Sequence, residues 1–204
     1  MGNSWHERFG TEQYVYGEEP NQFIKEQAHR LGKGSKIVAF AEGEGRNAVY
    51  LALQGHIVTA YDYAENGLNK TNALAERHKV KISTELKNLI HDGVPAEEFD
   101  AAFMVFGHFS KDDQKTVMDK LISTVKPGGT IMFEVYSEDQ VKYGTGGPKT
   151  VEMLYDPSDV LEWIKGYKVL HFFYGEQERV EGELHTGTGH VIQVIIKKMQ
   201  IEQK

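Results

Sequence analysis

The sequence predicts a single doubly wound α/β domain with a mostly parallel seven-stranded sheet that ends in an antiparallel β-hairpin. Two observations lead to this fold class. Short apolar runs alternate with helical patterns through most of the chain, as in strands joined by crossover helices. Two further apolar runs, separated only by a polar segment, then close the chain as a hairpin. The length of 204 residues suits one such domain, so we expect residues 1–204 to form a single unit.

The expected elements follow in chain order from the same patterns. Pro20 favours a helix start, and Gly32 and Gly34 favour its end. Ser110 or Asp112 is expected to cap the fourth helix. The expected helices cover residues 20–31, 47–53, 66–79, 112–125 and 156–165. The expected strands cover residues 36–40, 56–62, 81–89, 99–107, 130–136, 167–174 and 190–197, with a turn at 126–129 and a polar connection at 175–189.

The composition narrows the class of protein. A formal charge of −7 and a pI near 5.7, without a basic stripe, argue against a nucleic-acid partner. The chain has no cysteine, which excludes disulfides and thiolate chemistry. No apolar run approaches the ~18 residues of a membrane span, and no leader pattern opens the chain. We therefore expect a soluble cytoplasmic protein without a membrane partner, either a monomer or a homodimer.

A glycine turn between the first strand and the following helix is the most informative motif. Residues 41–45 follow an apolar strand and precede an apolar-faced helix. Such a turn lets a nucleoside cofactor approach the backbone beside a helix N-terminus. The next strand ends in Asp62, and an acid at that place accepts hydrogen bonds from ribose hydroxyls. Together these features predict an adenosine-containing cofactor.

The residues around the turn discriminate between two cofactor classes. The spacing of Gly43, Gly45 and Ala48 also satisfies the dinucleotide fingerprint, so a nicotinamide-dependent oxidoreductase is one alternative. However, carboxylates at Glu42 and Glu44 would repel a diphosphate, whereas they suit an ammonium and a sulfonium group. The terminal hairpin is also unlike the second half of a dehydrogenase. Both observations favour S-adenosylmethionine.

Several motifs spread along the chain match one known family; they are residues 5–9, 14–21, 42–52, Asp62, 126–129, 143–148 and 153–155. On these motifs the chain resembles the class I S-adenosylmethionine-dependent methyltransferases, and within them the small tellurite-resistance-type and thiopurine-type bacterial enzymes. The resemblance runs nearly end to end and implies methyl transfer to a small-molecule acceptor, such as a thiol or a chalcogen oxyanion. A non-catalytic cofactor-binding module is a further alternative, since Ala39 and Ala41 replace an acid and a glycine of the family pattern.

The resemblance also implies a role for individual residues. Asp62 would bind the ribose, Arg46 would face the cofactor carboxylate, and Glu42 would compensate for the acid missing at Ala39. Tyr63 would pack beside the adenine, and Phe106 would line the pocket near the transferred methyl group. The full set of expected cofactor-binding residues is Ala41, Glu42, Gly43, Gly45, Arg46, Asp62, Tyr63, Asn88, Leu89 and Phe106.

Methyl transfer from a sulfonium is an in-line displacement in which alignment and a dry site contribute most. A soft or anionic acceptor needs no general base, so the catalytic residues stay open. Tyr16, His108 and Tyr143 are candidates for orienting the acceptor. Residues 1–20 are expected to form a flap over the cofactor or to pack in the core. Residues 137–156 are expected to form a substrate lid or a plain connection.

A metal site was the remaining alternative. His185 and His190 flank a short segment near Glu181 and Glu183. No thiolate or obvious ligand set completes a site there. We therefore expect a polar loop and no metal.

Overall fold

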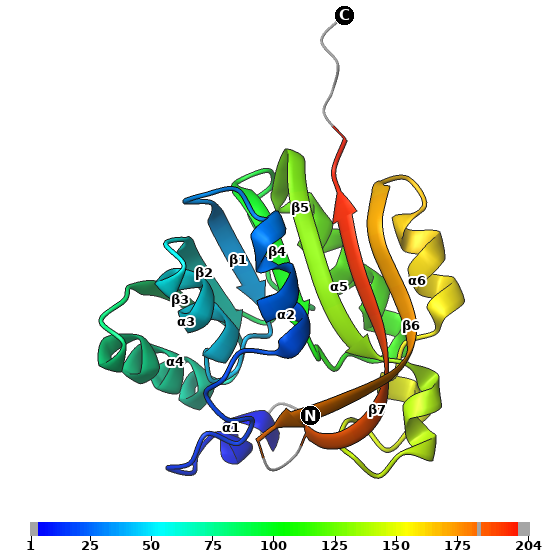
Figure 1. The fold of residues 1–204 in the computed structure, drawn as a ribbon, viewed down its shortest axis with the longest axis horizontal. Coiled ribbons are helices and arrows are strands. Elements are labelled where there is room, and N and C mark those ends of the chain that lie inside the picture. Colours follow the sequence, from blue (N-terminus) through cyan, green and yellow to red (C-terminus); the bar gives the residue numbers. More distant parts are fainter. Residues whose placement is uncertain (1–3, 183–184, 200–204) are drawn as a thin grey trace, which may run out of the picture.

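The computed structural model describes residues 4–182 and 185–199, and these form one seven-stranded sheet with helices on both faces (Figure 1). The strand order is β3-β2-β1-β4-β5-β7-β6. Strands β1 to β5 pair in parallel, whereas β7 is antiparallel to both β5 and β6. The predicted fold class is therefore confirmed.

The elements have the following bounds. The strands are β1 (Lys36–Phe40), β2 (Ile57–Asp62), β3 (Ile82–Leu86), β4 (Phe99–Val105), β5 (Val125–Tyr136), β6 (Lys168–Glu181) and β7 (His185–Lys197). The α-helices are α1 (Ser4–Arg8), α2 (Gln22–Gln27), α3 (Arg46–Leu53), α4 (Glu65–Arg77), α5 (Lys111–Ser123) and α6 (Pro157–Ile164). Short 3-10 helices cover Ala28–Arg30, Glu138–Lys142 and Val151–Met153.

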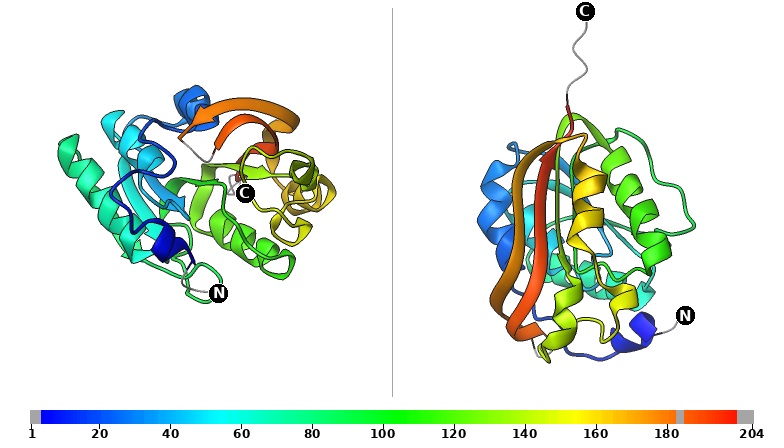
Figure 2. Two further views of the ribbon diagram at one scale, coloured as in Figure 1. Left: turned by 90° about the horizontal axis from the view of Figure 1, so that it is seen from below. Right: turned by 90° about the vertical axis from the view of Figure 1, so that its right-hand side faces the viewer.

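Two apolar clusters hold the layers together. On one face α2, α3 and α4 pack on the sheet, and on the other face α5 and α6 do so (Figure 2). Phe103 is fully buried in the first cluster, and Phe133 is fully buried in the second. Because both faces are covered, the central strands are apolar on both sides, which explains why their sequences read as continuous apolar runs.

Three element predictions were wrong in detail. The first helix is shorter than expected, because the Asn21 side chain accepts a hydrogen bond from Ile24 N at 3.0 Å and a 3-10 turn follows at Ala28. The turn expected at 126–129 lies within β5 as an irregularity. Gly128 has a φ of +79° there, and its N–H donates to the Lys198 carbonyl at 2.8 Å.

The third correction concerns the polar connection expected at 175–189. Most of it is strand: β6 continues to Glu181 and β7 begins at His185, with Glu176 opposite His190. The polar residues can form strands here because the hairpin extends past the edge of the central sheet, where it is only partly covered. Figure 1 shows this extension bending beneath the carboxyl ends of the parallel strands toward α1.

The hairpin end packs against the N-terminal segment. Gly182 has a φ of +66°, and a Cβ added to it would lie 2.5 Å from the Tyr16 carbonyl carbon. The close approach of two backbones thus requires glycine at this position. The segment that follows α1 is therefore held in place by the far end of the chain.

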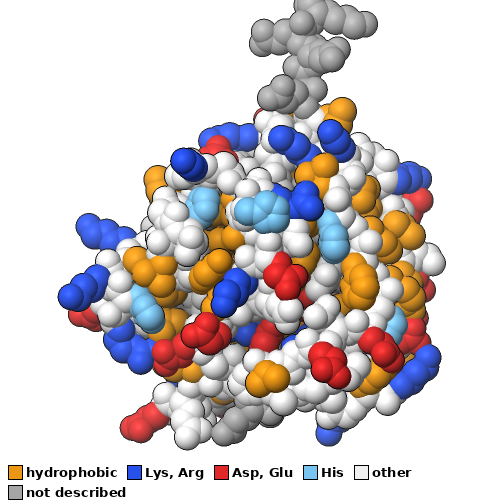
Figure 3. Space-filling model, in the orientation of Figure 1, with side chains coloured by type: hydrophobic (Ala, Val, Ile, Leu, Met, Phe, Trp, Pro, Cys, Tyr) orange, Lys and Arg blue, Asp and Glu red, His pale blue; other side chains and the backbone are white. Residues whose placement is uncertain are grey.

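On the face drawn in Figure 3, lysine and arginine side chains lie among acidic and apolar ones rather than in one continuous stripe. In the described part of the chain, no helix is long and apolar enough to cross a bilayer.

We expect Gly182→Ala to destabilise the protein more than Gly34→Ala does. Both glycines have a φ of +66°, so both variants carry a left-handed alanine, at a cost of about 1–2 kcal/mol. Only Gly182→Ala adds a backbone clash, which should cost a further ~1–3 kcal/mol. Nothing lies within 4 Å of a Cβ at Gly34, which makes it the matched control. Urea unfolding measures both, and equal losses of stability would contradict the contact.

Candidate functional site

A cavity of about 970 Å³ opens at the carboxyl ends of β1, β2 and β4. Its wall contains the predicted cofactor-binding residues except Gly45, and two of the three acceptor-orienting candidates, Tyr16 and His108. The wall also contains residues that the sequence analysis did not assign to the site, among them Asn47, Lys87, Ile90, His91, Val105 and Asp113. The adjacent strand ends bring residues together that are far apart in the sequence.

The glycine turn has the conformation that its sequence requires. Ala41, Gly43 and Gly45 all have positive φ values, of 50°, 64° and 88°. For Ala41 this region is unfavourable by roughly 1–2 kcal/mol, and such strain persists where the surroundings impose it. Gly45 serves packing rather than the cavity wall, because a Cβ there would lie 2.8 Å from the Cα of Thr71 on α4.

Asp62 joins the end of β2 to this turn. One carboxylate oxygen accepts a hydrogen bond from Gly43 N and the other from Ala64 N, both at 2.8 Å. Burial raises the pKa of Asp62 to about 6, although these backbone donors act against the rise. The carboxylate is thus fixed at the cavity wall, with lone pairs remaining for ligand hydroxyls.

Glu42 places a second carboxylate at the start of α3. Its Oε1 accepts a hydrogen bond from Ala48 N at 2.7 Å. Burial raises the pKa of Glu42 to about 8, against the lowering effect of that bond and of Arg46. Ala39, in contrast, is fully buried in the apolar cluster beneath α3 and does not line the cavity. Of residues 39 and 42, only Glu42 therefore brings a carboxyl group to the cavity wall.

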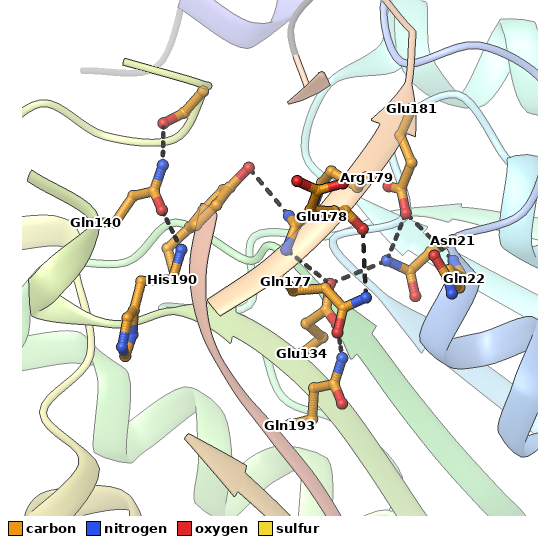
Figure 4. A network of polar contacts seen from close by, with 12 residues as sticks. Asn21, Gln22, Glu134, Gln140, Gln177, Glu178, Arg179, Glu181, His190 and Gln193 are labelled. Atoms are coloured by element: carbon orange, nitrogen blue, oxygen red, sulfur yellow. Dashed lines mark hydrogen bonds and ion pairs between the residues drawn. The ribbon is translucent and has the colours of Figure 1, made fainter. Parts of the chain in front are cut away.

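Arg46 lines the cavity and forms a buried ion pair. Its Nη2 lies 2.6 Å from Glu181 Oε2 at the end of β6, and both side chains are buried. The other oxygen of Glu181 accepts hydrogen bonds from Asn21 Nδ2 and Gln22 N (Figure 4). Sequence reasoning missed Glu181, because no local pattern reveals a contact between residues 135 positions apart.

The end of β4 supplies Phe106 and His108. Phe106 has a φ of 53°, and its ring stacks on Tyr136 with the ring centres 4.5 Å apart. His108 Nε2 is buried and has no hydrogen-bond partner among the described residues. Burial, with a contribution from Arg8, lowers the pKa of His108 to about 4, so its ring is neutral at neutral pH.

The N-terminal segment contributes to the wall through Trp5, Phe9, Tyr16 and Gly17. The three aromatic rings pack together, with the Trp5 and Phe9 centres 5.5 Å apart and the Phe9 and Tyr16 centres 6.5 Å apart. Of the expected lid at 137–156, Met153 lines the cavity. Tyr143 does not line it; its hydroxyl donates to Glu176 on the extended hairpin.

The residues that the sequence offered as metal ligands make other contacts in the structure. Ser137 Oγ and His190 Nδ1 are 2.7 Å apart, and Glu181 is paired with Arg46. Within residues 4–182 and 185–199, no three histidine or carboxylate side chains gather as a metal site. Glu183 and the side chain of His185 lie outside the part of the chain that the structure describes.

Comparisons with known proteins agree with this geometry. Residues 37–129 match the family model of a methyltransferase domain. TehB of Haemophilus influenzae, described as a probable S-adenosyl-L-methionine-dependent methyltransferase, is 25% identical over 152 residues, which are 74% of this chain and 50% of the relative. The chain thus spans about half the length of the curated relatives it matches.

Solved structures share the fold at low identity. TehB from H. influenzae has a TM-score of 0.73 at 17% identity, covering 97% of this chain and 66% of TehB. A protein studied for the conversion of a disulfide bond into a thioacetal group during echinomycin biosynthesis has a TM-score of 0.74 at 14% identity, covering 97% and 90% of the two chains. The [4+2]-cyclase SpnF has a TM-score of 0.68 at 12% identity, covering 98% and 91%.

The matched domain, the relatives and the strand order together support the resemblance of this chain to the class I S-adenosylmethionine-dependent methyltransferases, among them TehB. The resemblance stated from the sequence is confirmed, and S-adenosylmethionine is the cofactor of this class.

The raised pKa of Glu42 predicts a pH-dependent stability. Between about pH 4.5, the ordinary value, and about pH 8, the unfolded chain releases the Glu42 proton while the folded chain retains it. The folded state therefore loses stability relative to the unfolded state as the pH rises through this window. Glu42→Gln lacks the titrating group. The free energy of unfolding of this variant, relative to that of wild type, should therefore increase with pH, by at most ~1.4 kcal/mol per pH unit.

Urea unfolding without cofactor at pH 5, 6.5 and 8 measures this difference. Glu76→Gln, at an exposed position of α4, is the control and should differ from wild type by a constant amount. A Glu42→Gln difference that does not change with pH would show that this carboxyl group titrates normally.

Proposed function

We propose that this chain transfers the methyl group of S-adenosylmethionine to a small-molecule acceptor bound in the same cavity. The observation that carries the proposal is the pair of buried acids at the glycine turn: Glu42 belongs to the turn, and Asp62 accepts a hydrogen bond from it. A cofactor with ribose hydroxyls, an ammonium and a sulfonium group matches this donor and acceptor set. A dinucleotide diphosphate does not, because the Glu42 and Glu44 carboxylates flank the turn.

The other cofactor contacts are assigned to residues that line the cavity wall. Arg46 would meet the cofactor carboxylate with the guanidinium nitrogens that Glu181 does not engage. Tyr63 would lie beside the adenine, with Asn88 and Leu89 at its edge. Phe106 would face the methyl group from the end of β4, where its positive φ turns the chain toward the cavity.

The chain's own residues mainly exclude water and orient the reactants. When bound, the cofactor supplies a sulfonium-activated methyl group. His108 is a weak base in this site because its pKa is lowered to about 4. The acceptor atom should therefore be soft or already anionic when it arrives, as a thiolate or a chalcogen oxyanion is. The sulfur chemistry named for the echinomycin-pathway neighbour is compatible with a sulfur acceptor.

The fold by itself does not fix the reaction, since a [4+2]-cyclase shares it. Catalysis is tested by following S-adenosylhomocysteine formation with a panel of thiols and chalcogen oxyanions. Turnover of one member, lost on removal of the cofactor, would support the proposal. Tight cofactor binding without turnover of any member would favour the non-catalytic binding module and count against the acceptor class proposed here.

The placement of the cofactor predicts the effect of Asp62→Ala. Calorimetric titration should show micromolar binding of S-adenosylmethionine and S-adenosylhomocysteine and none of NADH. Asp62→Ala should weaken both by about 1–3 kcal/mol through lost hydrogen bonds to the ribose. The control is Asp119→Ala, at an exposed ion pair on α5, which should bind as wild type does. Unchanged affinity in Asp62→Ala would show that the ribose lies elsewhere.

A further inference from the structure

The charged groups of the cavity wall are compensated within the chain. Among its cations, Arg46 pairs with Glu181 at 2.6 Å, and Lys87 lies 3.4 Å from Glu85. Its carboxylates also have internal partners: Glu42 and Asp62 accept backbone N–H groups, Glu44 pairs with Lys70, and Asp113 accepts the Ser110 hydroxyl. Each of these charged side chains is thus already engaged within the chain.

Arg8 on α1 differs from these wall residues in its contacts. Its guanidinium carbon lies 4.5 Å from the centre of the Trp5 ring, and its Nη1 donates to the Tyr16 hydroxyl at 3.1 Å. Both of these residues line the cavity, whereas Arg8 itself is exposed. Within the described residues, no carboxylate lies within ion-pair distance of Arg8. Among those residues, no carboxylate compensates the positive charge of the Arg8 guanidinium at the cavity rim.

The field of this charge reaches the interior of the site. Arg8 lowers the pKa of His108 at the end of β4 and opposes the burial-driven rise in the pKa of Tyr63 at the end of β2. Trp5 lies between the two groups in contact distance of both, because its ring centre is 4.5 Å from the Arg8 guanidinium carbon and 5.4 Å from the His108 ring centre. His108 lines the cavity, and its Nε2 is a buried polar atom without a partner in the described part of the chain.

We propose that Arg8, together with His108, forms an anion subsite that selects a negatively charged acceptor for methylation. This rests on the proposed function and extends it, because it names the charge of the acceptor and the residue that reads it. The aromatic faces of Trp5 and Phe9 complete the subsite with apolar walls. A soft anion gains the most from such a site, because it is less strongly hydrated than a hard one and loses less on entry.

The reaction balances without a proton. A lone pair of the anionic acceptor forms the bond to the methyl carbon, and the electron pair of the broken carbon–sulfur bond returns to the sulfonium sulfur. An anion and a sulfonium thus become a neutral methylated acceptor and a neutral thioether. Neither His108 nor Tyr16 has to accept a proton, in agreement with the lowered pKa of His108.

The subsite can be tested with iodide, a soft anion that quenches tryptophan fluorescence on contact. In a Trp163→Phe background, emission reports on Trp5 alone, since the chain has two tryptophans. Potassium iodide replaces potassium chloride at constant ionic strength, and neutral acrylamide corrects for any change in the exposure of Trp5. We expect Arg8→Gln to lower the ratio of iodide to acrylamide quenching about twofold or more.

Arg30→Gln is the matched control. It removes the same charge from an exposed arginine outside the cavity wall, one that hydrogen-bonds to Gln27. Its ratio should equal that of the parent protein. If Trp163→Phe does not fold, the Trp5 signal is obtained as the difference between the intact chain and Trp5→Phe. Equal ratios for Arg8→Gln and Arg30→Gln would overturn the proposal.

A further titration separates this subsite from the cofactor site. The iodide effect should persist when the protein is saturated with S-adenosylhomocysteine. Its loss on saturation would mean that Arg8 serves the cofactor carboxylate, and the acceptor subsite would be withdrawn. Failure of the proposed function is distinguishable, because it appears as absent cofactor binding in calorimetry and leaves the iodide effect unchanged.

Discussion

The bonds from Asp62 to the backbone of the glycine turn are the interaction on which the site depends. The carboxylate spans from the end of β2 to Gly43, which follows β1, and so fixes the relative positions of two strand ends. The turn has three residues at positive φ, and within it Glu42 N donates to the Tyr61 carbonyl at 3.2 Å, whereas Gly43 N donates to the Asp62 carboxylate. A buried acid is a suitable partner, since charge-assisted hydrogen bonds are stronger than neutral ones. The same acid is then presented to the cavity.

A buried polar network likewise fixes the position of the N-terminal segment, which forms part of the cavity wall. Glu181 links Arg46 to Asn21, and Asn21 in turn donates to Glu134 on β5, near Arg179 (Figure 4). Buried ion pairs contribute little net stability, because desolvation offsets their attraction. Their geometry is nevertheless demanding, and a wrong position of the N-terminal segment would leave several charges buried without partners. We infer that the network specifies where the segment lies rather than how stable the domain is.

The sequence predicted those parts of the fold and site that are local. The β1–turn–α3 unit, the acid at the end of β2 and the aromatic end of β4 each lie within one short window, and parallel strands must bring their ends together. It did not predict the contacts between distant segments, such as Arg46 with Glu181. The hairpin was predicted too short, because the strands continue beyond the core, where polar residues replace the apolar runs from which the strands were predicted. Tyr143 was named from a glycine-rich motif, but its partner Glu176 lies on that unforeseen extension.

The site combines buried acids of raised pKa with a histidine of lowered pKa, and both shifts have burial as their largest cause. Burial favours the neutral form of each group, so these side chains carry less charge than their composition indicates. A cationic cofactor would reverse this for the acids, because it favours their ionised forms, whereas an anionic acceptor would find a neutral imidazole and the positive rim. The site would then gain its charges together with its ligands. Since transfer of the methyl group removes charge from both reactants, a site that excludes water opposes the transition state least.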